Sequence, residues 1–140
     1  MLQRKRAKIL IGMVLGALWG VVLVGGPQWL GVKYIPTPVA LPFAFVAPGL
    51  FLAVVIGFLA QRRFFDDEII DGEPFAPGSP NEIAQRVLTN TVEQLVLALA
   101  IWPLATASLG GAVAISLGLG FAAMRVLFWI GYLSSPPLRA

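Results

Sequence analysis

The chain has 140 residues, of which 58% are hydrophobic and only 12% are charged. A soluble domain of this length carries about twice that share of charge, so the composition indicates an integral membrane protein. It contains no cysteine and no histidine, which excludes disulfides, a thiol nucleophile, the usual general base and the commonest metal ligand. The net charge of +3 comes without a basic patch interleaved with aromatics, so we predict no nucleic-acid partner.

The first apolar run extends from Ile9 to about Val24 and follows the basic residues 1–8. This pattern resembles a signal peptide, but the run ends in GGPQWL and not in a small-x-small cleavage site. Trp19 and Trp29 suit a membrane interface. We therefore expect an uncleaved first span and a Gly- and Pro-rich connector, which together make residues 1–38 an N-terminal unit.

The second apolar run covers residues 39–60, which at 1.5 Å per residue is long enough to cross roughly 30 Å of hydrocarbon. Pro42 can occupy its first turn, whereas Pro48 is expected to kink the helix. Residues 64–81 form a polar segment with five carboxylates. Three consecutive acidic residues at 66–68 could suggest a cation site, but they lack the spacing of a calcium loop. We interpret the segment as a solvated loop and predict no metal site.

Ser79 and Pro80 predict the start of a third helix, which we expect over about residues 82–107. The short connection at 108–111 predicts an antiparallel hairpin with a fourth helix over about residues 112–133. Small residues on that helix, Gly118 among them, allow neighbouring backbones to approach closely. The predicted fold class is therefore an all-α membrane protein with four transmembrane helices.

The charges also predict an orientation in the membrane. With four spans, both termini share one side, and the basic residues then lie at or near that side, apart from Lys33. Because cytoplasmic loops are enriched in lysine and arginine, we expect both termini and the acidic loop to be cytoplasmic.

Two polar stripes interrupt the apolar pattern of the last two helices. Arg86, Asn90 and Glu93 lie at i, i+4 and i+7, which places them on one helix face. Arg125 and Tyr132 are seven residues apart on the next helix. An arginine inside a membrane costs up to roughly 2.5–3.5 kcal/mol, so Arg125 should have a partner. Glu93 is the natural candidate for that partner.

The stripes admit two interpretations. An Arg125–Glu93 pair that staples the hairpin, or snorkelling of Arg125 alone, explains them without any ligand. If the stripes meet, they form a cationic pocket at one membrane face, which suits a small anionic ligand because guanidinium groups bind carboxylates bidentately. Such a pocket is poorly suited to hydrolysis, so any catalysis would need a reactive group from a cofactor.

The segments RVLTNTVEQ and RVLFWIGYLSSPPLR resemble the MAPEG family, the membrane-associated proteins in eicosanoid and glutathione metabolism. The family pattern R-x-x-x-N-x-x-E falls on the first stripe. A second pattern, an arginine, a tyrosine seven residues later and an arginine after a short turn, falls on Arg125, Tyr132 and Arg139. Arg62 and Arg63 match the arginine pair that ends the family's first helix. The resemblance covers roughly residues 43–140 and makes residues 39–140 a MAPEG-like three-helix region.

The resemblance implies a homotrimer in a bacterial inner membrane that binds glutathione between subunits at the cytoplasmic side. It implies a catalytic role for Arg139, since a nearby guanidinium lowers a thiol pKa and so favours the thiolate. The thiolate would attack a lipophilic electrophile or reduce a peroxide that arrives from the bilayer. The implied cofactor-binding residues are Arg62, Arg86, Asn90, Glu93, Arg125 and Tyr132.

The chain departs from the family pattern in two ways. It has an extra helix before the family's first helix and lacks the family's fourth, so we hypothesise that residues 9–24 fill the vacated position. Arg139 is the penultimate residue, and a frayed terminus positions a catalytic group badly. The alternative function is therefore a non-catalytic membrane subunit or scaffold that keeps the fold within a larger membrane complex.

Overall fold

The computed structural model describes the backbone of residues 2–134 and the side chains of residues 6–134. Within these residues there are four helices and no strand, and all four helices are long and apolar enough to cross a membrane. The prediction of an all-α membrane protein with four spans is therefore confirmed. Each helix extends beyond its predicted ends: α1 is Leu2–Trp29, α2 is Thr37–Phe64, α3 is Pro80–Leu109 and α4 is Gly111–Ser134.

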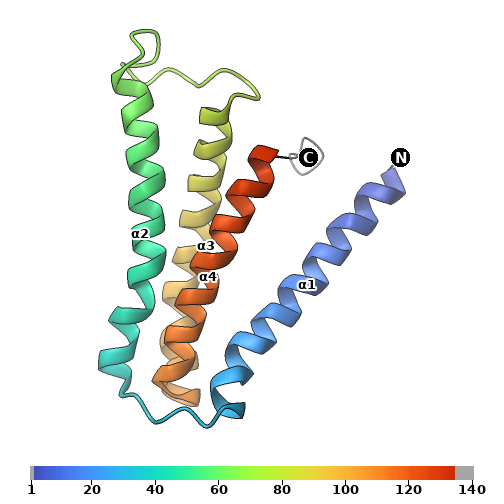
Figure 1. The fold of residues 1–140 in the computed structure, drawn as a ribbon, viewed down its shortest axis with the longest axis vertical. Coiled ribbons are helices and arrows are strands. Elements are labelled where there is room, and N and C mark those ends of the chain that lie inside the picture. Colours follow the sequence, from blue (N-terminus) through green and yellow to red (C-terminus); the bar gives the residue numbers. More distant parts are fainter. Residues whose placement is uncertain (1, 135–140) are drawn as a thin grey trace.

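The helices α2, α3 and α4 form a bundle, and α1 leans away from it. Figure 1 shows α2, α3 and α4 side by side, whereas α1 meets the bundle only near the connector and diverges toward its own N-terminus. The helix α2 continues through Pro42 and Pro48, and Pro48 is buried in the bundle. The proline ring is therefore covered by neighbouring helices, and in membrane proteins such neighbours help to satisfy the backbone carbonyl that a proline leaves without its donor.

The half of the bundle near the connector, which we call the outer half, is held together by close backbone approach. A Cβ atom placed on Gly118 would collide with the Ala44 carbonyl of α2. The amide of Gly111 donates to the carbonyl of Ile35 at 3.2 Å. Small residues at helix interfaces allow this proximity and so gain van der Waals contact without any hydrophobic driving force between the helices.

The opposite half, which we call the inner half, has larger side chains in its core. Trp129 of α4 packs edge-on against Phe51 and Phe58 of α2, with ring centroids 6.0 and 5.7 Å apart. Phe75 from the polar loop is buried in the same cluster. The loop after α2 is therefore anchored in the bundle, and the expected solvated loop is packed at this point.

The start of α3 follows the sequence prediction. Ser79 is the N-cap, and its hydroxyl accepts a hydrogen bond from the amide of Glu82 at 3.1 Å. Pro80 occupies the first helical position, where its missing N–H group is not needed. The cap fixes the position at which α3 emerges from the loop and therefore the height of the polar stripe that follows.

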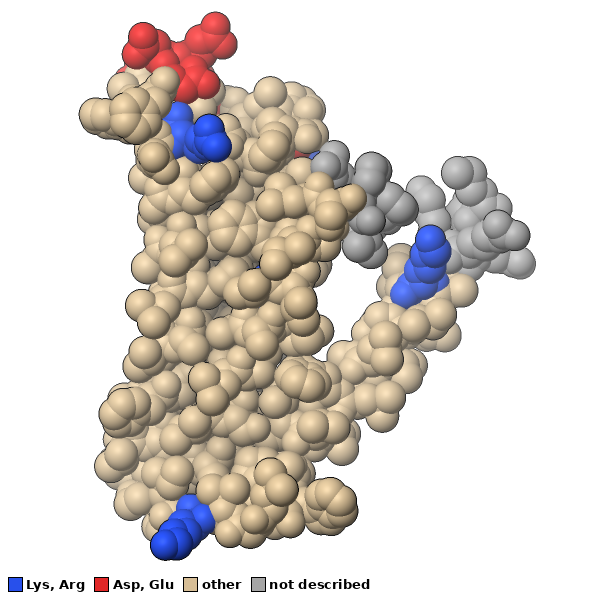
Figure 2. All heavy atoms as spheres, in the orientation of Figure 1, with Lys and Arg blue, Asp and Glu red and all other residues tan. Residues whose placement is uncertain are grey.

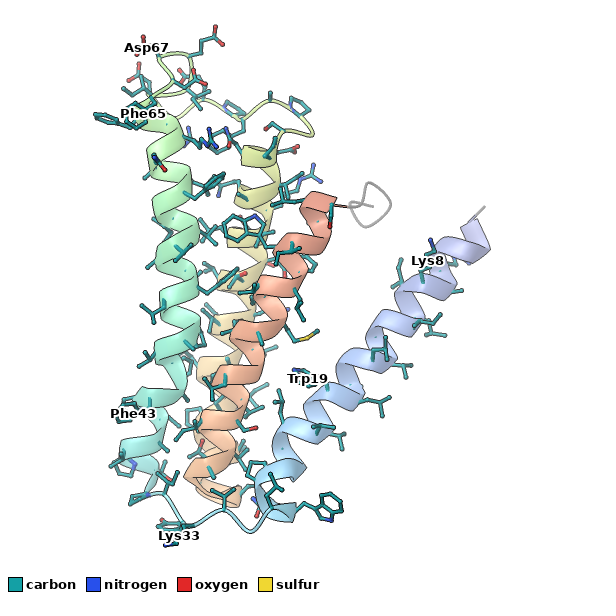
Figure 3. All side chains as sticks on the ribbon, viewed as in Figure 1. Lys8, Trp19, Lys33, Phe43, Phe65 and Asp67 are labelled. Carbon is teal, nitrogen blue, oxygen red and sulfur yellow. The ribbon has the colours of Figure 1, made fainter. Side chains whose placement is uncertain are left out.

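Charge is concentrated at the inner end of the molecule. Figure 2 shows the acidic residues of the loop and neighbouring basic residues at that end. Figure 3 shows Asp67 and Lys8 toward that end, on opposite sides of the molecule, and Lys33 at the other end. The separation matches the charge asymmetry from which the sequence predicts an orientation.

The helix α1 does not complete the bundle in the single chain. Its residues 6–19 are all exposed, and its contact with α4 is made near its outer end, where Leu23 covers Gly120. Figure 1 shows its N-terminal half separated from the C-terminal end of α4. Within one chain, residues 9–24 therefore do not pack along the inner half of the bundle, contrary to the hypothesis that they occupy the position of a further family helix. The described contact of α1 with α4 holds only the outer end of the helix.

Candidate functional site

The two polar stripes meet at one pair of side chains. Arg125 of α4 donates from Nη1 to the Oδ1 atom of Asn90 on α3, with an N···O distance of 2.5 Å. Arg125 is only partly exposed. The donor is a charged guanidinium, and a hydrogen bond from a charged group is stronger than one between neutral groups. The contact confirms that Arg125 faces the third helix, although its partner is an amide and not the expected carboxylate.

Two aromatic rings of its own helix lie close to the Arg125 guanidinium. Its central carbon lies 5.1 Å from the centroid of the Phe121 ring and 5.5 Å from that of Phe128. A guanidinium within about 6 Å of a ring face is attracted by the ring quadrupole. The rings and the Asn90 amide together offset part of the cost of holding this charge inside the membrane.

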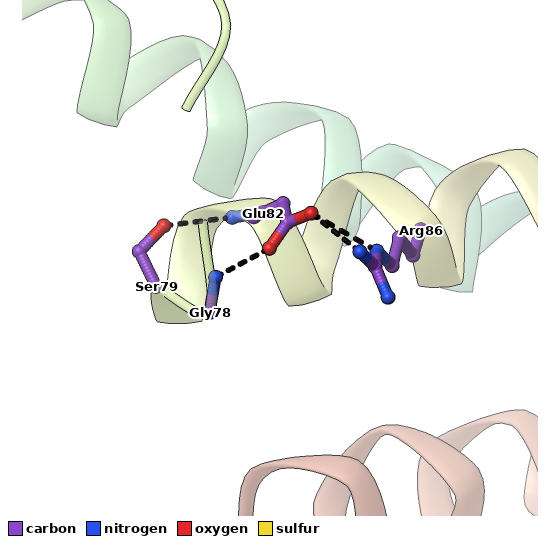
Figure 4. A network of polar contacts seen from close by, with 4 residues as sticks. All are labelled: Gly78, Ser79, Glu82 and Arg86. Carbon is purple, nitrogen blue, oxygen red and sulfur yellow. Dashed lines mark hydrogen bonds and ion pairs between the residues drawn. The ribbon is translucent and has the colours of Figure 1, made fainter. Parts of the chain in front are cut away.

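Arg86, one turn before Asn90, is bound within its own helix. Its guanidinium contacts Glu82 Oε1 through Nη2 at 2.7 Å and through Nε at 3.1 Å. The other carboxylate oxygen of Glu82 accepts from the amide of Gly78 at 2.5 Å. Figure 4 shows this network, which joins the loop, the cap and the first two turns of α3. An i, i+4 spacing with the acid first is the stabilising order on a helix, so the sequence did contain the signal for Glu82.

Glu93 follows Asn90 by three residues on α3, and Tyr132 follows Arg125 by seven on α4. Glu93 is exposed, and no ion pair joins it to any side chain among residues 6–134. Tyr132 is partly buried, and its ring lies 4.7 Å from that of Phe128. In the single chain the predicted Arg125–Glu93 pair is therefore not formed, because the shorter Asn90 side chain faces α4 and Glu93 points outward.

Arg62 is apart from the stripes, at the end of α2. Its guanidinium lies 5.2 Å from the centroid of the Phe58 ring. It lines a pocket of about 320 Å³ together with Gln61, Phe65, Asp66 and Asn81. None of the stripe residues lines this pocket. The structure therefore brings Asn90 and Arg125 into contact but leaves Arg62 separate from them, and Arg139 lies outside the described residues.

Arg63 has a structural role that the sequence did not predict. Its Nη1 atom donates to the carbonyls of Ile69 and Glu73, each at 3.0 Å, and its guanidinium lies 4.3 Å from the centroid of the Phe75 ring. One side chain therefore folds the loop back onto the end of α2. No spacing rule predicts these partners, because both acceptors are backbone atoms of a loop.

The described site combines two guanidinium groups, those of Arg86 and Arg125, with two carboxylates, those of Glu82 and Glu93. Guanidinium groups, an amide, a carboxylate and a phenol can bind the charged ends of a small zwitterionic or anionic molecule. Among the residues that the structure describes, no three potential metal ligands of the His, Cys, Asp or Glu type come together. The chain contains no cysteine, so it has no thiol of its own.

The fold and the site define a helical membrane bundle with polar side chains between α3 and α4. We call these side chains, Arg86, Asn90, Glu93, Arg125 and Tyr132, the polar seam. The MAPEG family model matches residues 39–140, which is most of the chain and nearly all of the bundle. The chain therefore belongs to the MAPEG family. Comparisons with curated proteins and with solved structures found no match. The extra helix α1 lies outside the matched region.

Proposed function

We propose that this protein binds glutathione at the inner end of the bundle, at the polar seam of α3 and α4. The observation that carries the proposal is the Arg125–Asn90 hydrogen bond, because it brings two stripes from separate helices to one place. Family membership supports glutathione as the ligand, since the family is associated with glutathione and eicosanoid metabolism.

The charges of the seam fit the charges of the tripeptide. Glutathione carries two carboxylates and one ammonium group at neutral pH. Arg86 and Arg125 can receive the carboxylates, and the exposed carboxylate of Glu93 can receive the ammonium group. Asn90 and Tyr132 offer hydrogen bonds to its peptide groups. Arg86 and Glu93 are exposed on the single chain. A neighbouring copy in a homotrimer would cover the ligand from the other side. Arg62 would approach the ligand only in that assembly.

We place the seam at the cytoplasmic side of a bacterial inner membrane. Lysine and arginine gather at the inner end, and Lys33 is at the other end. Glutathione is a cytoplasmic thiol, so a binding site at this end has access to its ligand.

The catalytic part of the proposal concerns Arg139. The chain has no cysteine, and glutathione supplies the thiol when bound. A guanidinium near that sulfur favours the thiolate, which is the nucleophilic form. The lipid-facing surface of the bundle would admit a lipophilic electrophile or peroxide directly from the bilayer. The activity would be that of a glutathione transferase or peroxidase.

Ligand-dependent thermal stabilisation of the purified protein tests the binding step. A ligand present at about one hundred times its Kd stabilises the folded state by about 2.7 kcal/mol. We expect millimolar glutathione to raise the Tm of the wild-type protein, and Arg86→Ala and Glu93→Ala to abolish the increase. Thr89→Ala is the matched control, because the exposed Thr89 hydroxyl contacts only the Gln85 carbonyl of its own helix.

The readout is the shift in Tm caused by glutathione and not the Tm itself, since loss of Arg86 also removes its ion pair with Glu82. A wild-type protein whose Tm is unchanged by millimolar glutathione would overturn the proposal. An Arg139→Ala variant that still binds glutathione but no longer lowers its thiol pKa would support the catalytic assignment.

A non-catalytic scaffold within a larger membrane complex is the second candidate, and one observation favours it. Arg86 and Arg125 both have partners within the described chain, Glu82 and Asn90. The Arg125–Asn90 contact can staple α3 to α4 without any ligand, whereas the Arg86–Glu82 pair lies within α3. In that case Arg125→Leu together with Asn90→Leu would preserve assembly, and glutathione would leave the Tm of every variant unchanged.

A further inference from the structure

The face of α1 that is turned toward the bundle carries glycines with Trp19 among them, and residues 6–19 of this helix are all exposed. Leu23 covers Gly120 of α4, and it lies seven residues after Gly16 and eleven after Gly12. These spacings place all three α1 residues on one helix face. Yet a Cβ atom built on Gly12 or on Gly16 would find no atom within 4 Å. Figure 2 shows the open wedge between this part of α1 and the bundle.

A second glycine-rich face lies on the outside of α2. Gly49, Ala53 and Gly57 are all exposed. Each lies two residues before a buried residue of the same helix: Phe51, Val55 and Leu59. Two residues correspond to a rotation of about 200° at 3.6 residues per turn, so the small residues are opposite the buried face. A Cβ atom on Gly49 or Gly57 would also meet nothing within 4 Å.

The two faces match in depth and direction. The chain runs from the inner to the outer end along α1 and in the opposite direction along α2. In one membrane, α1 of one copy and α2 of another copy are therefore antiparallel. Gly12 follows Lys8 by four residues, and Gly57 precedes Arg62 by five, which is roughly 6 and 7.5 Å inside the charged ends. From there both faces repeat every four residues, as Gly12, Gly16, Gly20 and as Gly57, Ala53, Gly49.

Charge at the inner end favours the same pairing. Arg6 and Lys8 are exposed on α1. The end of α2 and its loop carry five carboxylates against Arg62 and Arg63, and Arg63 is engaged with loop carbonyls. In this pairing the basic inner end of α1 therefore faces the net acidic inner end of α2 and its loop. The two ends cannot meet within one chain, because α1 packs on α4 and has no packing contact with α2.

We propose that the wedge is occupied by α2 of a second copy of this chain, packed antiparallel on α1 through the two glycine-rich faces. Each copy then receives the α2 helix of one neighbour and offers its own α2 to another. Such a head-to-tail contact closes into a ring when the rotation permits. The proposal goes beyond glutathione binding, because it requires only that the chains assemble.

Cysteine cross-linking tests this contact directly, because the chain has no cysteine of its own. Two differently tagged chains, Gly16→Cys and Ala53→Cys, are expressed together in membranes and oxidised. We expect a disulfide that joins the two tags, since Cα atoms in such a contact approach within disulfide range. The matched control is Val14→Cys with Ala53→Cys, because Val14 is two residues from Gly16 and faces away from the wedge.

The other outcomes are equally distinct. Cross-linking of Gly16→Cys with itself at the expense of the mixed product would mean that α1 pairs with α1 and would overturn the proposal. Absence of the mixed product, with both variants folded, would mean that lipid alone fills the wedge. A charge exchange refines the result: Lys8→Glu should reduce the mixed product, and Lys8→Glu combined with Asp67→Lys should restore it. The readout is assembly, so failure here leaves the glutathione proposal untouched.

Discussion

The outer and inner halves of the bundle are built on different principles. In the outer half, helix backbones nearly touch, as at Gly118 and Ala44. In the inner half, bulky rings around Trp129 fill the core, and polar contacts such as Arg125–Asn90 join the helices. The comparison teaches that close packing fixes the bundle at one end and leaves the other end free to carry polar groups. Substitutions in each half should therefore differ in size and in kind.

The largest effect is expected at Gly118. Leucine there must displace the Ala44 backbone, and overpacking of this kind costs about 3 kcal/mol or more where backbone cannot yield. We expect Gly118→Leu to separate α4 from α2 and to lower the Tm strongly, as measured by circular dichroism in detergent. The control is Gly25→Leu, at an exposed position where a Cβ atom meets nothing within 4 Å. A Gly118→Leu variant as stable as this control would disprove close packing in the outer half.

The Arg125–Asn90 contact should have an intermediate effect. Asn90→Leu leaves a partly buried guanidinium without its amide partner, and we expect a loss of about 1–2 kcal/mol of stability. Arg125→Leu removes the charge together with its desolvation cost, so the double variant should be less unstable than the sum of the two single changes. A double-mutant cycle measures the coupling. Additive effects within error would show that the contact carries no energy.

Arg63 should affect the loop more than the bundle. Arg63→Ala removes the donor to two loop carbonyls, and each lost hydrogen bond costs about 1 kcal/mol. We expect faster proteolysis between residues 65 and 79 and faster amide exchange there, with little change in the helices. Arg63→Lys should rescue the loop only in part, because an ammonium group lacks the planar fork. Arg62→Ala is the control, and its loop should be cleaved at the wild-type rate.

The N-cap of α3 should show the smallest effect. Ser79→Ala removes the acceptor for the Glu82 amide, which typically costs about 1 kcal/mol. Ser108→Ala is the control, because that exposed hydroxyl contacts only a carbonyl of its own helix. Equal Tm values for the two variants would mean that the cap does not determine the start of α3.

Much of the fold could be read from local patterns. Apolar length predicted the four helices, and Ser79–Pro80 predicted the start of α3. The helix ends were less accurate, since polar residues such as Arg63 continue a helix beyond the hydrocarbon. For the site, the spacing of Arg86, Asn90 and Glu93 predicted the stripe, and the cost of a charge in the membrane predicted that Arg125 would have a partner.

The identity of that partner could not be predicted in the same way. Glu93 has the opposite charge, but Asn90 lies closer to α4 because of the rotation of α3 about its axis. The Glu82 partner of Arg86 was visible as an i, i+4 pair and was missed in favour of a ligand. The carbonyl partners of Arg63 had no signal at all, because they depend on the path of a loop.

The amino-acid sequence by itself determined that the chain crosses a membrane four times and that charge gathers at one end. It did so because hydrophobic length and charge act locally, residue by residue, against a bilayer of known thickness. Only the tertiary structure decided that Arg125 faces Asn90 and that α1 stands away from the bundle. Those outcomes depend on how helices rotate and tilt against one another, and small residues such as Gly118 set that geometry through contacts between distant parts of the chain.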